Sequence, residues 1–446
     1  MRIELSGHYG VWRLVRTSLP SIAMMLITSV YSIIDGFFVS NFAGTTAFAA
    51  LNLVWPVIAL LAALGLMAGT GGSALVSKLL GEDNADKARS IFTMIVFLST
   101  AAGIICSVLL LVFMKPLVIA LGAQGDLVGH AVRYGRIVSL GMTGYIQQMT
   151  FQSFYMTAER PELGTRMSLV CGCLNILLDA LFIAGFGWGL TGAAIATALA
   201  LMVGGIYPLI YFSSGRNGSH LRFVPFGSID WKAIGKTCTN GMSEYVGNIA
   251  LSIVSIGYNF QLMKYAGEDG VSAYGIIMYL GFILAAVFIG YNLCVSQVIA
   301  FNYGAGNREE LRSLLRKSLG IIGVSGILLT SLAEIFAPAI SRIFVGYDPA
   351  LCELTVRALR IYMLCFLLSG FNMFCSAWFT ALNNGLISAV AAFARTLVFE
   401  LASVFVLPVF FGIDGIWMAV NVAEVLAFIL ASALILGYRE RYLGRS

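Results

Sequence analysis

Charge-free apolar stretches long enough to cross a bilayer recur throughout this chain of 446 residues, and they restrict its fold more than any other feature. Between Arg16 and Lys78 the only side chain that is normally charged is Asp35. About 20 apolar residues in a helix cross about 30 Å of hydrocarbon. Soluble domains have about 25% charged residues, whereas this chain has 11%. We therefore expect an all-α integral membrane protein.

The apolar stretches predict twelve transmembrane helices. Their approximate ranges are 14–41, 50–76, 90–114, 133–157, 164–186, 189–213, 236–261, 271–301, 316–338, 355–381, 386–409 and 413–437.

The lysines and arginines predict the orientation of these helices. If both termini are cytoplasmic, nineteen basic residues lie on the cytoplasmic side and seven on the other, and Arg395 lies inside a helix. Cytoplasmic loops carry the excess of Lys and Arg in membrane proteins, so this orientation is favoured. The seven are Lys115, Arg133, Arg136, Lys264, Arg342, Arg357 and Arg360.

The two halves of the chain resemble each other. The segment "LGEDNADKARS" (80–90) matches "YGAGNREELRS" (303–313), and "GLTGAAIA" (189–196) matches "GIDGIWMA" (412–419), both at an offset of 223 residues. "FAG" (42–44) returns as "YAG" (265–267), and "AVRYGRI" (131–137) as "TVRALRI" (355–361). Parallel repeats of six helices are a known transporter architecture. We expect an N-terminal lobe at 1–213, a cytoplasmic linker at 214–235 and a C-terminal lobe at 236–446, with a cleft between the lobes.

Two acids lie inside predicted helices of the first half. Asp35 is in the first, and Asp179 is the only charge between Arg166 and Arg216. A charged side chain within a membrane usually faces an internal cavity and marks a functional site. Tyr31 precedes Asp35 by four residues, and Asn175 precedes Asp179 by four, so each pair shares a helix face.

Other polar side chains of the same half are candidates for this pocket: Gln147, Gln148 and Gln152 in the fourth helix and Thr197 in the sixth. Carboxylate, amide and hydroxyl oxygens suit a proton or Na⁺. A structural alternative is that each acid only stabilises helix packing.

The second half does not repeat this acidic pair, because Tyr258 and Ala402 occupy the corresponding positions. It has its own membrane charges, Glu244, Arg395 and Glu400, for which an ion pair or a contact between lobes is as plausible as transport. Glu334, Asp414 and Glu424 are interpreted as interfacial or packing residues.

Two function classes are disfavoured. There is no Walker motif, so transport must use an ion gradient or be passive. No cluster of catalytic residues or metal ligands suggests an enzyme, and no cofactor is expected other than the coupling ion, H⁺ or Na⁺.

Taken together, these segments resemble the multidrug and toxic compound extrusion (MATE) family. The resemblance depends on "LPSIAMMLITSVYSIIDGFFVSNFAG", "LGEDNADKARS", "LNILLDALFIAGFGWGLTGAAIATALA" and "YGAGNREELRS". It implies a V-shaped pair of six-helix lobes that exports cationic, amphipathic compounds in exchange for H⁺ or Na⁺.

The resemblance also implies an ion and substrate site in the N-terminal lobe at Tyr31, Asp35, Asn175, Asp179 and Thr197. Gln152 stands where archaeal members tend to have asparagine. A Na⁺ ion would be bound by Asp35, Asn175, Asp179 and Thr197. Gln148, Glu244, Arg395 and Glu400 are secondary candidates. The predicted tenth helix lacks the acid that many members use for a second site, which favours coupling in the N-terminal lobe.

The sequence thus predicts a secondary active antiporter for multidrug efflux, and hence antibiotic resistance, in the plasma (inner) membrane. We expect a monomer with no nucleic-acid partner. The alternative is a lipid-linked oligosaccharide flippase of the same superfamily, which would need a cationic cavity for pyrophosphate.

Overall fold

The computed structural model of the protein describes residues 4–42, 45–214 and 219–444. Helices account for 89% of the chain, and the described residues contain no strand. Residues 215–218 of the predicted linker and Gly44 of the "FAG" segment lie outside the described residues. The all-α prediction is confirmed.

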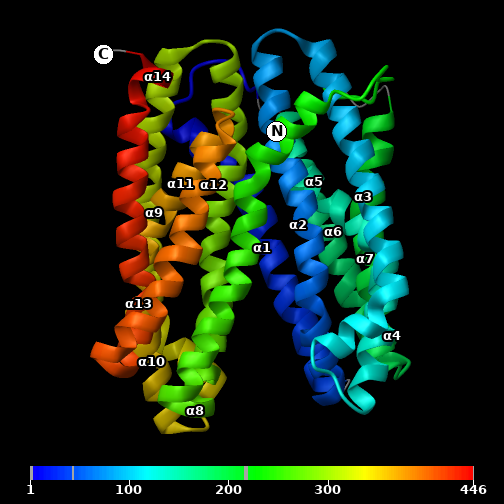
Figure 1. The fold of residues 1–446 in the computed structure, drawn as a ribbon, viewed down its shortest axis with the longest axis vertical. Helices are drawn as coiled ribbons and strands as arrows, with labels where there is room; N and C mark the ends of the chain where they lie inside the picture. Colours follow the sequence, from blue (N-terminus) through cyan, green and yellow to red (C-terminus); the bar gives the residue numbers. More distant parts are fainter. Residues whose placement is uncertain (1–3, 43–44, 215–218, 445–446) are drawn as a thin grey trace.

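The helices form two bundles side by side (Figure 1). We call the first the N-terminal lobe; it contains α1 (Val11–Phe42), α2 (Thr45–Gly81), α3 (Ala85–Ala120), α4 (Asp126–Leu140), α5 (Met142–Thr157), α6 (Pro161–Asp179), the π-helix η1 (Ala180–Gly185) and α7 (Gly189–Ser213). The second, the C-terminal lobe, contains α8 (Trp231–Gly304), α9 (Arg308–Val345), α10 (Pro349–Met363), α11 (Phe366–Ala381), α12 (Gly385–Phe393), the π-helix η2 (Ala394–Glu400), α13 (Leu401–Gly437) and α14 (Arg439–Leu443).

Eight helical segments of the described chain are long and apolar enough to cross a membrane. Two of them cross twice, because α8 is interrupted at Gly267 (φ 61°) and α13 at Gly412 (φ 58°), in backbone conformations that favour glycine. The remaining two predicted crossings are each divided into two helices, α4 and α5 around Gly141 and α10 and α11 around Leu364 and Cys365. This accounts for the twelve predicted membrane helices.

The sequence repeat has a structural counterpart. Asn84 caps α3 by accepting a hydrogen bond from the backbone N–H of Lys87, and Asn307 caps α9 in the same way from Glu310. The residues before these caps, Asp83 and Gly306, both have positive φ (59° and 69°). The side-chain caps start equivalent helices in both lobes at the offset of 223 residues.

The two lobes touch closely at the end that holds both chain termini (Figure 1). There α2 crosses α8 at two repeat-related glycines. A Cβ atom on Gly81 would lie 2.0 Å from the carbonyl oxygen of Phe301, and one on Gly304 would lie 1.9 Å from that of Lys78. Only glycine permits backbones to approach so closely. We call this contact the glycine crossing.

A buried polar network lies beside the glycine crossing. The amide nitrogen of Gln297 in α8 donates a hydrogen bond to Ser73 of α2 (3.0 Å), and Ser77 of α2 donates one to its amide oxygen (3.0 Å). These bonds hold the lobes in one register at the closed end.

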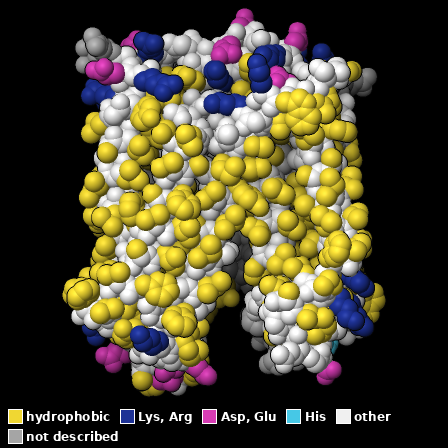
Figure 2. Space-filling view, viewed as in Figure 1, with side chains coloured by type: hydrophobic (Ala, Val, Ile, Leu, Met, Phe, Trp, Pro, Cys, Tyr) yellow, Lys and Arg dark blue, Asp and Glu magenta, His cyan; other side chains and the backbone are white. Residues whose placement is uncertain are grey.

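At the opposite end the lobes separate, and Figure 2 shows a cleft between them. Apolar side chains cover a wide band of both lobes, and charged side chains gather above and below this band. Such a band is the surface expected next to lipid. The molecule therefore has the V shape that the family resemblance implied.

Candidate functional site

Four helices of the N-terminal lobe, α1, α5, α6 and α7, converge around a group of buried polar side chains. Glycines provide the necessary space. A Cβ on Gly172 of α6 would lie 3.0 Å from the ring of Tyr31 in α1, and one on Gly204 of α7 would lie 2.9 Å from the side chain of Gln148 in α5. We call the space between these helices the polar chamber.

The two acids of the first lobe meet in the polar chamber. Asp35 interacts with both Asp179 and Asn175. The Asp179 side chain has no exposed surface and that of Asn175 is 3% exposed, while Asp35 is partly buried. Two carboxylates cannot both stay charged in such a place without a compensating cation or proton.

Several polar atoms of the chamber have no hydrogen-bond partner among the described residues. They are Oδ1 of Asp35, both carboxylate oxygens of Asp179, Nδ2 of Asn175, Oε1 of Gln148 and the hydroxyl of Tyr134. Oγ1 of Thr197, two helical turns before Gly204 on α7, also has no partner in the part of the chain that the structure describes. A buried polar atom without a partner costs about 1–3 kcal/mol, so this cluster is costly unless it binds something. Its oxygen donors fit a proton or a hard cation such as Na⁺.

The π-helix η1 begins directly after Asp179. A π turn shifts the register of a helix and is frequent at functional sites. Here it separates α6, which carries Asn175 and Asp179 on one face, from the loop leading to α7.

The glutamines of α5 divide between two environments. Gln148 lies beside Tyr31 in the chamber. Gln147 points to α3, where its amide nitrogen donates hydrogen bonds to Ser99 (2.9 Å) and Thr100 (2.8 Å). The prediction that Gln147 belongs to the pocket is therefore wrong, because neighbouring residues on a helix point about 100° apart. Gln152 is buried, and the only hydrogen bond described for it goes to the sulfur of Met149 (3.7 Å).

In the C-terminal lobe, Arg395 is neutralised by Glu424. The guanidinium donates to Oε1 of Glu424 from Nη2 (2.6 Å) and Nε (2.9 Å), and Asn372 donates to Oε2 (2.5 Å). Glu424 is 4% exposed. Of the two alternatives predicted for Glu424, interfacial or packing, the structure supports packing, because the residue is a buried ion-pair partner.

Glu400 makes no ion pair within the described part of the chain, although the guanidinium of Arg395 is near enough to attract it. It interacts with Tyr258, which occupies the position in the repeat that Asp35 has in the first lobe. Tyr258 stacks on Tyr274 with ring centroids 4.7 Å apart, and the ring of Tyr362 lies 6.2 Å away. Where the first lobe has a pair of acids without a cation, the second lobe therefore has an aromatic core beside two acids, Glu400 and Glu424, and the arginine Arg395.

Glu244 lies on α8, in the part of this helix before the break at Gly267. It is exposed, and it follows Gly241 by three residues on the helix face that packs against Met67 of α2. It does not join the acids of either lobe.

Comparison with known proteins identifies the family. A family model for MatE matches residues 20–181 and again residues 244–406. The chain belongs to the MatE family. The two matches correspond to the two halves of the repeat, and the MatE family consists of membrane transporters rather than enzymes.

Curated relatives of this MatE protein include the multidrug export protein MepA of Staphylococcus haemolyticus, which is 24% identical over 425 residues, 95% of this chain and 93% of the relative. MepA of Staphylococcus aureus is 23% identical over 427 residues, with the same coverage.

Solved structures share the MatE fold over the whole chain. A crystal structure of MATE in complex with MaL6 superposes with a TM-score of 0.91 at 22% identity and covers 98% of each chain. The outward-facing conformation of a multidrug resistance MATE family transporter of the MOP superfamily gives 0.91 at 22% identity, covering 98% of this chain and 97% of that one. A MOP superfamily transporter from Pyrococcus furiosus, described as having a binding pocket of reverse polarity, gives 0.90 at 23% identity over 99% and 98%.

One polar-chamber residue of this MatE protein was not anticipated from the sequence. Tyr134 of α4 is fully buried and interacts with both Asp35 and Asp179. A tyrosine in a membrane helix is common and uncharged, so it has no signal comparable to that of an isolated acid. The one sequence feature that could have pointed to Tyr134 is its difference from Ala358, the residue at the matching position of "TVRALRI" in the second half.

Proposed function

We propose that this protein exports cationic amphipathic compounds by antiport with H⁺ or Na⁺, and that Asp35 and Asp179 bind the coupling ion. The observation that carries the proposal is the interaction of these two carboxylates beside Asn175, with oxygen atoms that have no partner among the described residues. The names of the curated relatives, multidrug export proteins, support the class of substrate.

The proposed coupling is electrostatic. When the chamber has released its ion, its negative charge attracts a cationic substrate through the lobe wall. When H⁺ or Na⁺ binds, that charge is neutralised, Tyr31 and Asp35 repack in α1, and the affinity for the cation falls. Asn175 and Thr197 would complete a Na⁺ site, and Gln148 and Gln152 would adjust its polar wall.

The available energy is sufficient for drug export. One charge moving down 100 mV supplies about 2.3 kcal/mol, which corresponds to roughly 50-fold accumulation. Substrate selection would depend on apolar and aromatic walls together with negative charge, so a broad range of compounds is expected.

We further propose that the protein acts in the plasma (inner) membrane as a monomer. The excess of basic residues supports a cytoplasmic position for the end with the glycine crossing and both termini. In that orientation the cleft opens to the outside, where a substrate would be released.

Drug efflux from proteoliposomes tests the ion-binding role of the acids. We expect Asp35→Asn and Asp179→Asn each to reduce gradient-driven efflux at least 10-fold, because an amide removes the titratable, cation-binding charge. Asp126→Asn is the matched control, since Asp126 is an exposed acid of the same lobe at the start of α4. Purified amounts and melting temperatures should match the wild type.

Applying a pH gradient and a Na⁺ gradient separately identifies the ion. A proton-coupled protein loses efflux when the pH gradient is collapsed at constant Na⁺. A Na⁺-coupled protein loses efflux when the Na⁺ gradient is collapsed at constant pH. Wild-type rates for both aspartate variants would disprove the assignment of the coupling site.

The flippase alternative is not favoured. A pyrophosphate carrier needs an uncompensated cationic cavity, whereas the arginine inside the membrane in the second lobe, Arg395, is paired with Glu424 and the first lobe contributes acids.

A further inference from the structure

The basic residues on the predicted outer side are not scattered. Six of the seven line two crevices at the open end of the molecule, one on each lobe: Lys115, Arg133 and Arg136 in the N-terminal crevice, and Arg342, Arg357 and Arg360 in the C-terminal crevice. In the sequence repeat, Arg133 and Arg136 correspond to Arg357 and Arg360.

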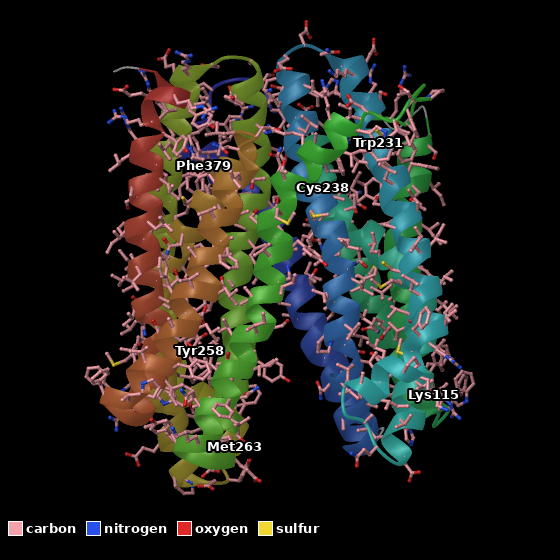
Figure 3. All side chains as sticks on the ribbon, in the orientation of Figure 1. Lys115, Trp231, Cys238, Tyr258, Met263 and Phe379 are labelled. Atoms are coloured by element: carbon pink, nitrogen blue, oxygen red, sulfur yellow. The ribbon has the colours of Figure 1, made fainter. Side chains whose placement is uncertain are left out.

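The N-terminal crevice lies where the end of α3 meets α4. It has a volume of about 610 Å³, and Val128, Val132 and Ile137 form its apolar lining. Arg133 and Arg136 are three residues apart on α4 and so share one helix face. Figure 3 labels Lys115 at the outer edge of this lobe, and Figure 2 shows basic side chains gathered at the same place.

The two crevices differ in how their charges are balanced. In the C-terminal crevice Arg357 pairs with Asp414, Arg360 lies 3.8 Å from Glu334, and Glu353 is part of the lining. Within the described part of the chain, Lys115, Arg133 and Arg136 make no ion pair or hydrogen bond, and no acid lines their crevice. Three positive charges therefore converge without an internal partner.

The surroundings of Lys115 indicate which anion can reach this crevice. Its neighbours on α3 are exposed apolar side chains, including Val112 (60% exposed), Phe113 (56%) and Ile119 (52%). Such a surface faces acyl chains, and a lysine at its end extends toward the headgroups. At this depth the abundant anion is a lipid phosphate.

We propose that the N-terminal crevice binds the headgroup phosphate of an anionic phospholipid in the leaflet at the mouth of the cleft. Lys115, Arg133 and Arg136 bind the phosphate, and the apolar surface of α3 contacts an acyl chain. The C-terminal crevice does not bind such a lipid, because Asp414, Glu334 and Glu353 neutralise its arginines.

Lipid titration of the delipidated full-length protein tests this site. Native mass spectrometry would follow binding of phosphatidylglycerol, with phosphatidylcholine as the zwitterionic comparison. The triple variant Lys115→Gln, Arg133→Gln, Arg136→Gln should bind phosphatidylglycerol about 100-fold more weakly, since each basic residue near an anionic surface contributes about 1 kcal/mol. Phosphatidylcholine binding should not change.

Two control proteins make the result specific. Lys264→Gln removes an exposed basic residue from the same side outside both crevices and should bind like the wild type. The charge-keeping variant Lys115→Arg, Arg133→Lys, Arg136→Lys should also retain binding, which separates loss of charge from misfolding.

Three outcomes would overturn the proposal. These are undiminished phosphatidylglycerol binding by the triple glutamine variant, an equal loss in Lys264→Gln, and displacement of the lipid by inorganic phosphate alone. The last result would indicate a site for a free anion.

Discussion

At the scale of single residues, the Arg395–Glu424 pair is the clearest structural use of charge in the membrane. Glu424→Gln should lower the free energy of unfolding by about 3 kcal/mol, because it leaves a guanidinium largely buried without its counter-charge. The double variant Arg395→Gln, Glu424→Gln should recover most of this loss. Melting temperatures in detergent measure these changes in stability. The control is Glu268→Gln, which replaces an exposed acid of α8. A single variant as stable as the wild type would contradict the pairing.

Some residues of the polar chamber could be predicted from the sequence, and others could not. Asp35 and Asp179 could be predicted because an acid in an apolar stretch has few explanations. Tyr134 could not, since a neutral phenol does not alter the hydropathy pattern. Gln147 was misassigned because α5 is buried on nearly all sides, so its sequence does not show which face meets the acids.

At the scale of the elements, the glycine crossing between α2 and α8 keeps one end closed. Gly304→Ala places a methyl group 1.9 Å from the Lys78 carbonyl oxygen, so the helices must separate. Spin labels at Asp86→Cys and Glu309→Cys, two exposed repeat-related positions, should report a longer distance across the closed end, in a background without the native cysteines. Gly320→Ala is the control, because nothing lies within 4 Å of its Cβ. An unchanged distance in Gly304→Ala would show that the crossing does not keep this end closed.

Helix positions followed from hydropathy wherever one helix crosses the membrane without a break. The prediction 189–213 coincides with α7 (Gly189–Ser213). The division of the fourth crossing at Gly141 and of the tenth around Cys365 was not predicted, because a kink within an apolar stretch leaves its average hydropathy unchanged.

At the scale of the whole molecule, the two lobes share a fold and differ in chemistry. The repeat predicted the shared fold, including the caps at Asn84 and Asn307. It also predicted that Tyr258 replaces Asp35. The pairing of Arg395 with Glu424 could not be chosen from the sequence, because the two residues lie 29 positions apart and depend on how η2 and α13 pack.

The central claim is that α1 and α6 direct Asp35 and Asp179 into one chamber. Dibromobimane, a short thiol crosslinker that becomes fluorescent after reacting twice, tests it in membranes lacking the native cysteines. The pair Asp35→Cys with Asp179→Cys should become fluorescent. The pair Asp35→Cys with Leu177→Cys should not, because Leu177 is 67% exposed on another face of α6. Fluorescence in the second pair and none in the first would contradict the account.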